Sequence, residues 1–72
     1  MQTERIKNSA LETGHVIVTR SDRGNVVATH VVQEVSRCTS DRSNRHVAAR
    51  DRKTNGIANW CMFDNSESEV QV

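Results

Sequence analysis

The feature that most constrains this fold is the dipeptide Asn55-Gly56, which separates two strand-like segments, RHVAARDRK (45–53) and IANWCMFD (57–64). The two central residues of a type I′ turn both need positive φ, and Asn-Gly tolerates that conformation best. We therefore predict a β-hairpin with a type I′ turn at Asn55-Gly56.

Valine dominates the apolar residues of the chain, with ten copies beside one Trp, one Phe, no Tyr and no Pro. β-branched side chains are stiff and suit a pleated surface, so this composition favours strands. Two further segments read as strands, HVIVTR (15–20) and the alternating EVQV (69–72).

The segment NVVATHVVQEVSR (25–37) fits no single period. Its apolar residues fall into two sets on opposite faces of a strand: Val27, Val31 and Val35, and Val26, Ala28 and Val32. A long, bent strand that changes its buried face explains both sets. An amphipathic helix is the alternative by spacing, but the many β-branched residues favour the strand.

At the N-terminus, TERIKNSALE (3–12) has the features of a short helix, with Thr3 as N-cap and Gly14 as a stop. Ten residues are marginal for a helix without tertiary support, so a flexible arm is the alternative. We therefore divide the chain into an N-terminal helix or arm (1–14) and a small β-barrel domain (15–72). The expected class is mainly β, a strongly bent antiparallel five-stranded barrel whose layout resembles SH3-like and Sm-like barrels.

Charge is distributed unevenly. Residues 20–53 carry eight basic and four acidic side chains, whereas residues 57–72 carry three acidic and no basic ones. Such a split is typical of a nucleic-acid-binding face beside an acidic tail. It is also what two regions show when they neutralise each other within the fold, which is the interpretation we favour.

The densest basic stretch, RSNRHVAARDRK (42–53), holds five of the ten Lys and Arg residues. Alternate residues of a strand point to opposite faces, so Val47 and Ala49 should face the core. The outer face should then carry His46, Ala48, Arg50 and Arg52. The candidate residues for binding nucleic acid or a partner are Arg42, Arg45, His46, Arg50, Arg52 and Lys53.

Two interpretations of this stretch stay open. Guanidinium groups about 7 Å apart roughly match the phosphates of an extended single strand, and Arg20, Arg23 and Arg37 would add to such a surface. An exposed strand face, however, needs polar residues in any case, and single-strand binders also stack bases on aromatic side chains. The only candidates for stacking are Trp60 and Phe63, along with His30 and His46, so we favour a merely solvated face.

Other chemistries find little support. His15, His30, His46, Cys38 and Cys61 lack the close pairs that zinc sites show, and no nucleophile signature surrounds either cysteine. We expect no metal, no cofactor and no enzymatic activity. No apolar run approaches the roughly 20 residues that span a bilayer, and no signal peptide precedes the strands. We therefore expect a cytoplasmic protein with no membrane contact, reduced cysteines and a buried Cys61.

These features predict a small, non-enzymatic regulatory module that binds a protein partner, for example by pairing an exposed strand edge through EVQV (69–72). Short, Arg-rich proteins of this kind are common products of phages and mobile elements, where they act on host transcription or nucleic-acid machinery. The alternative is a barrel that binds RNA or single-stranded DNA through the basic 42–53 hairpin. Because so short a chain has a small core, a homo-oligomer is compatible with either function.

Overall fold

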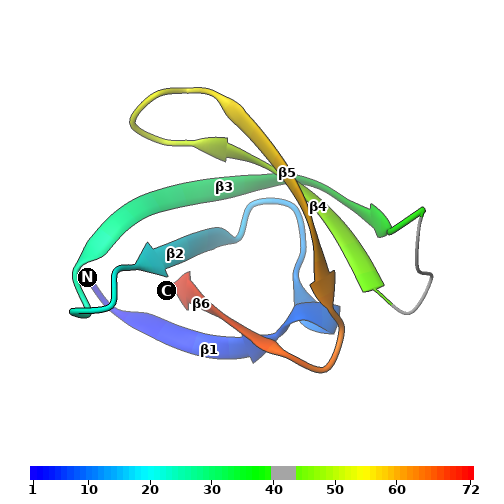
Figure 1. The fold of residues 1–72 in the computed structure, drawn as a ribbon, viewed down its shortest axis with the longest axis horizontal. Helices are drawn as coiled ribbons and strands as arrows, with labels where there is room; N and C mark the ends of the chain where they lie inside the picture. The colour runs from blue at the N-terminus through cyan, green and yellow to red at the C-terminus, as the bar shows by residue number, and fades with distance from the viewer. Residues whose placement is uncertain (40–43) are drawn as a thin grey trace.

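A computed structural model describes residues 1–39 and 44–72, which form one antiparallel sheet with the strand order β1-β6-β2-β3-β4-β5 (Figure 1). The elements are β1 (Thr3–Lys7), the 3₁₀ turn η1 (Asn8–Ala10), β2 (Val16–Arg20), β3 (Val26–Arg37), β4 (Asn44–Asp51), β5 (Ile57–Phe63) and β6 (Glu67–Gln71). The mainly β class is confirmed. The count of five strands and a closed barrel are not, since the sheet contains six strands and its order ends at β1 and β5.

Strand β3 joins the two halves of the sheet. Its first part pairs with β2 and its second part with β4, and the register shifts between Val32 and Glu34. Val32 is fully buried before this bulge, and Val35 packs against the core after it. A bulge adds one residue and so changes which alternate side chains face inward. The predicted bent strand that changes its buried face is therefore confirmed.

The β4–β5 hairpin is also confirmed, but its turn differs from the prediction. The connection is longer than two residues, because Asp51 ends β4 and Ile57 begins β5. Asn55 has φ of 66°, while Gly56 is not among the residues with positive φ. The Asp51 carboxylate accepts hydrogen bonds from the backbone N–H groups of Lys53 and Thr54. This Asp-centred loop replaces the type I′ turn because the side chain itself satisfies the loop amides.

The core lies on the concave side of the bent sheet. Its fully or nearly fully buried members come from several strands and the segment after η1: Leu11, Ile17, Val32, Val47, Ala49 and Val70. Val47 and Ala49 are 0% exposed, so the predicted inward face of β4 is confirmed. Ile6, Val35, Trp60 and Met62 pack against this cluster.

The N-terminal helix predicted for residues 3–12 is not confirmed, because Thr3–Lys7 forms the strand β1 and pairs with β6. Asn8 shows why the chain prefers this arrangement. Its side chain is buried, accepts a hydrogen bond from Ser68 Oγ and donates one of 2.8 Å to the carbonyl of Phe63. A ten-residue helix has weak intrinsic stability, so strand pairing and these tertiary contacts outweigh helix propensity.

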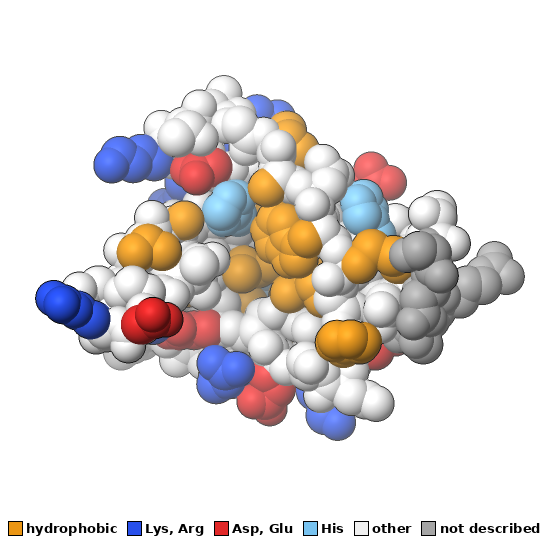
Figure 2. Space-filling model, viewed as in Figure 1, with side chains coloured by type: hydrophobic (Ala, Val, Ile, Leu, Met, Phe, Trp, Pro, Cys, Tyr) orange, Lys and Arg blue, Asp and Glu red, His pale blue; other side chains and the backbone are white. Residues whose placement is uncertain are grey.

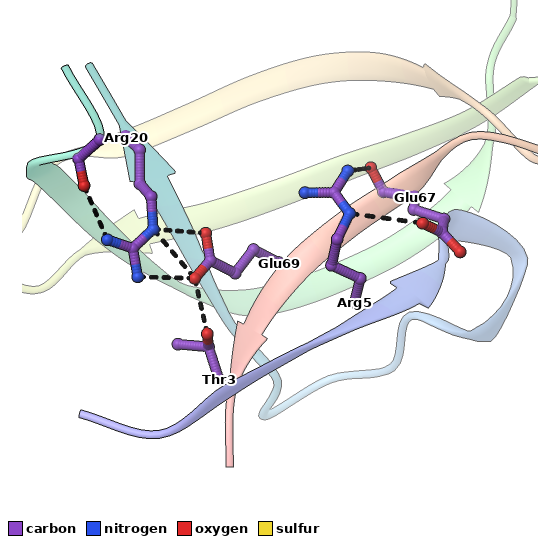
Figure 3. Close-up of polar contacts among 6 residues, drawn as sticks. Thr3, Arg5, Arg20, Glu67 and Glu69 are labelled. Carbon is purple, nitrogen blue, oxygen red and sulfur yellow. Dashed lines mark hydrogen bonds and ion pairs between the residues drawn. The ribbon is translucent and has the colours of Figure 1, made fainter. Parts of the chain in front are cut away.

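The acidic C-terminal region is paired with basic residues from earlier in the chain (Figure 3). The Arg20 guanidinium donates to both carboxylate oxygens of Glu69, and Thr3 Oγ1 donates to the same group. These hydrogen bonds lower the pKa of Glu69 from 4.5 to about 2. Arg5 forms a second, more exposed ion pair with Glu67.

Asp64 completes the pairing of the acidic residues. Arg37 Nη1 lies 2.7 Å from Asp64 Oδ2, and Arg45 Nε lies 3.4 Å from Asp64 Oδ1. The hydrogen bond from Arg37, assisted by Arg45, lowers the pKa of this carboxyl. Asp64 and Glu69 are thus bound to arginines of the basic region 20–53, whereas Glu67 is bound to Arg5 outside it, so the two charged regions neutralise each other in part.

The expectation of reduced cysteines is wrong, since Cys38 and Cys61 form a disulfide. Cys38 is buried, but Cys61 is exposed rather than the buried small hydrophobe that we expected. Sequence spacing gave no hint of this bridge, because it depends on the end of β3 curving towards β5. No helix among the described residues is long and apolar enough to cross a membrane.

Candidate binding edge on strand β5

Strand β5 forms one free edge of the sheet. It pairs with β4 along its whole length, and no described residue pairs with its other side between Ile57 and Cys61. Its seven residues, IANWCMF, contain no charge and no proline. Natural edge strands usually carry charged residues or proline, which block pairing with other chains. An edge strand without these residues is available for pairing.

The pairing register shows which backbone groups of β5 are available. The Asp51 N–H donates to the Gly56 carbonyl at the start of the hairpin. Antiparallel residues alternate between hydrogen-bonded and non-hydrogen-bonded pairs, so Ala58, Trp60 and Met62 direct their N–H and C=O groups towards β4. The intervening residues Ile57 and Asn59, with Cys61 and Phe63, direct theirs away from the sheet.

Side chains on this edge are largely apolar. Ile57 is 50% exposed and Phe63 is 67% exposed, both on the outer face of the strand. Trp60 faces inward and is half-buried, and its ring meets His30 edge-on at a centroid distance of 5.6 Å. Figure 2 shows hydrophobic side chains gathered in the middle of the face seen in Figure 1, with charged side chains mostly at its margins. Exposed apolar groups of this kind are typical of interaction surfaces.

The two ends of β5 are fixed in different ways. At the Phe63 end, the N-terminal segment lies close by, because Asn8 binds the Phe63 carbonyl and Ser9 N–H donates to the Asp64 carbonyl. At Cys61 the disulfide holds the strand to the end of β3. The strand is therefore held in an extended conformation before any partner binds, which lowers the entropy cost of pairing.

The predicted site residues lie at several places around β4. Arg50 Nη1 donates to the carbonyl and the side chain of Asn55, at 3.1 and 3.2 Å. Arg52 lies beyond the end of β4 and donates to Gln71 Oε1 at 2.9 Å. These guanidinium groups are exposed, but each is already bound to an acceptor within the chain. Lys53 lies in the same loop, where it lines an open hollow of ≈ 360 Å³ together with Val26 and Val27.

At the other end of β4, Arg45 points towards Asp64, and His46 Nδ1 lies 3.4 Å from Ser36 Oγ. His46 and Arg50 share the outer face as predicted, whereas Arg45 lies on the face of Val47. Arg42 falls outside the described residues. The structure thus separates a group at the hairpin loop from a group near the disulfide, and the role of these residues in binding stays a prediction.

Sequence reasoning did not single out β5 as a binding element, because it assigned EVQV to the exposed edge. In the structure β6 lies between β1 and β2, and it pairs with β1 along its length and with β2 at Val70. The absence of charge in IANWCMF was the available signal. One face of the strand belongs to the core, because Trp60 and Met62 pack there, and the other face is exposed.

The described residues contain no group of three or more His, Cys, Asp or Glu side chains that could hold a metal ion. Comparison of the chain with known protein families gives no match. No curated protein matches it either.

Proposed function

We propose that this protein is a small regulatory module that binds a protein partner by β-strand addition at the free edge of β5. The observation that carries the proposal is the uncharged, proline-free strand Ile57–Phe63, which presents outward backbone groups beside exposed Ile57 and Phe63. Main-chain hydrogen bonds supply affinity in this mode of recognition, and alternate side chains supply specificity.

The hydrogen bonds that the arginines already make within the chain favour a protein partner over a nucleic acid. Arg45, Arg50 and Arg52 donate to Asp64, Asn55 and Gln71 respectively. Binding to phosphates would require these groups to give up acceptors within the chain. Trp60 is half-buried and packs against the core, so of Trp60 and Phe63 only the exposed Phe63 ring is open to stacking by a base.

Proline at position 59 tests the proposal. The Asn59 N–H points away from β4, so Asn59→Pro removes an outward donor without breaking a hydrogen bond of the sheet. The matched control is Lys7→Pro on β1, where the backbone φ of −64° already suits proline. Both variants and the unmodified protein are immobilised and exposed to candidate protein partners.

Partners should bind the unmodified protein and the Lys7→Pro variant, and binding should be lost with Asn59→Pro. Equal capture by all three proteins would refute strand addition at β5. Capture that disappears on nuclease treatment would support the alternative, a module that binds RNA or single-stranded DNA through the basic hairpin.

A further inference from the structure

The exposed residues of β5 are arranged symmetrically about its centre. Ile57 lies three residues before Trp60 and Phe63 lies three residues after it, and both project from the outer face. An antiparallel pairing of two identical strands centred on Trp60 therefore places Ile57 of each copy opposite Phe63 of the other. Aromatic residues opposite β-branched residues are among the stabilising cross-strand pairs.

On this basis, and resting on the proposed strand addition at β5, we propose that a second copy of this chain occupies the edge. The two β5 strands pair antiparallel about Trp60 and give a two-fold symmetric dimer with a continuous sheet. Each copy thereby covers the unprotected edge of the other, and another protein partner has to compete with this dimer.

The backbone register supports this arrangement. Outward groups belong to Ile57, Asn59, Cys61 and Phe63, and pairing about Trp60 matches each of these residues with another of the same set. The central pairs join Asn59 of one copy to Cys61 of the other. The outward backbone N–H and C=O groups of both residues are available for these hydrogen bonds. At the ends, the Phe63 carbonyl already accepts hydrogen bonds from Asn8 and Ser66, which limits pairing there.

Charge is compatible with the same register. No charged residue occurs within Ile57–Phe63, so no like charges meet across the two strands. The loop that holds Lys53 precedes β5 and the turn before Glu67 follows it, so the antiparallel dimer places a basic loop and an acidic turn at the same end of the paired strands. Glu67 is exposed and is held by one exposed arginine, Arg5, so it can also interact with a second cation.

The size of the contact sets the expected affinity. One strand of seven residues offers less area than the roughly 800 Å² per partner of a standard interface. We therefore expect a dissociation constant in the micromolar range, and a dimer that forms and dissociates as concentration changes.

The decisive measurement combines sedimentation velocity with nuclear Overhauser contacts on the full chain. Within one copy, Ile57 and Phe63 are about 20 Å apart along an extended strand, too far for such a contact. A contact between the Ile57 methyl groups and the Phe63 ring in a mixture of labelled and unlabelled chains thus reports pairing about Trp60. We expect this contact together with a concentration-dependent dimer.

Asn59→Pro should raise the dissociation constant about tenfold or more, since it removes one hydrogen bond from each half of the dimer. Asn59→Lys is a second variant that keeps the backbone donor and should also weaken pairing by placing a charge on the edge. Lys7→Pro should leave the dimer unchanged. Thermal unfolding of each variant shows whether it is folded.

Three results would overturn the inference: a monomer at about 1 mM, a dimer that lacks the Ile57–Phe63 contact, or a dimer that both Asn59 variants leave intact. A monomer whose protein partners are still lost on Asn59→Pro would refute the second copy alone and leave the proposed function standing. If the Asn59 variants keep both the dimer and the protein partners, the second copy and the proposed strand addition are both refuted.

Discussion

The two edges of this sheet are built on opposite principles. β1 carries Glu4, Arg5 and Lys7 among its five residues, whereas β5 carries no charge among its seven. Charged side chains on an edge oppose pairing with another chain because pairing would desolvate them. One edge of the molecule is therefore protected, and the other is left open to pairing.

The two edges are also attached to the rest of the fold by different forces. The β1 side is held largely by polar contacts, namely the ion pairs of Glu67 and Glu69 (Figure 3) and the hydrogen bonds of the buried Asn8. The β5 side is held by Trp60 and Met62 against the core and by the disulfide. Reduction of the disulfide should therefore destabilise the β5 side first, whereas acid should destabilise the β1 side first.

The largest effect is expected from loss of the disulfide. The bridge joins two residues that are 23 positions apart in the sequence. In the chain-entropy model, closing a loop of this length stabilises a protein by about 3 kcal/mol. The double variant Cys38→Ala, Cys61→Ala should lose about this much free energy of unfolding in urea. A loss below about 1 kcal/mol would contradict the assignment of this role to the bridge.

Acid should loosen the β1 side. On β6, the pKa of Glu69 is lowered from 4.5 to about 2 by Arg20 and Thr3. The pKa of Asp64, which follows β5, is also lowered by Arg37 and Arg45, so a smaller acid effect is expected at that end of β4 and β5. A carboxyl with a lowered pKa stabilises the fold above its ordinary pKa, and this stability is lost as pH falls through the folded value. Unfolding should become easier from about pH 4.5 to pH 2.

Amide hydrogen exchange locates this acid effect. Amides of β1 and β6 should lose protection before those of β4 and β5 in the same pH range. Glu69→Gln removes the titrating group and should flatten the pH dependence of stability. The same slope in this variant as in the unmodified protein would show that other carboxyls are responsible.

Removing the charges of β1 should make the two edges alike. Glu4 and Lys7 are exposed, so Glu4→Val with Lys7→Val leaves the core intact while making the edge more apolar. Each favourable cross-strand pair contributes up to about 1 kcal/mol, so self-association should tighten by about tenfold. Light scattering against concentration measures this effect, and an unchanged profile would refute protection by charge.

The smallest effect is expected from the basic loop. Arg50→Ala with Arg52→Ala removes a partly buried and an exposed side chain, which contact Asn55 and Gln71, and should change stability by no more than about 0.5 kcal/mol. Fluorescence anisotropy with labelled RNA and single-stranded DNA, at about 50 and 200 mM salt, should show no binding by the unmodified protein. Binding tighter than about 10 μM that falls tenfold across this range would favour the nucleic-acid alternative.

The sequence by itself determined the strands from residue 15 onwards. Alternation placed Val47 and Ala49 in the core, the valines of 25–37 favoured a strand that changes face over an amphipathic helix, and Asn55-Gly56 marked the hairpin. These features depend on interactions between residues that are near in sequence or on the period of two within a strand. Such information is local, so it can be read without knowing the partners of each strand.

Only the tertiary structure decided the rest. Whether Thr3–Lys7 becomes a helix or a strand depends on β6, 60 or more residues away, and whether Cys38 meets Cys61 depends on how β3 bends. The same holds for the candidate site, because a strand is an edge only when no other strand lies beside it. IANWCMF has the same local pattern at an edge as in a core. Strand order, which no local pattern encodes, leaves Ile57–Cys61 without a neighbouring strand on one side among the residues that the structure describes.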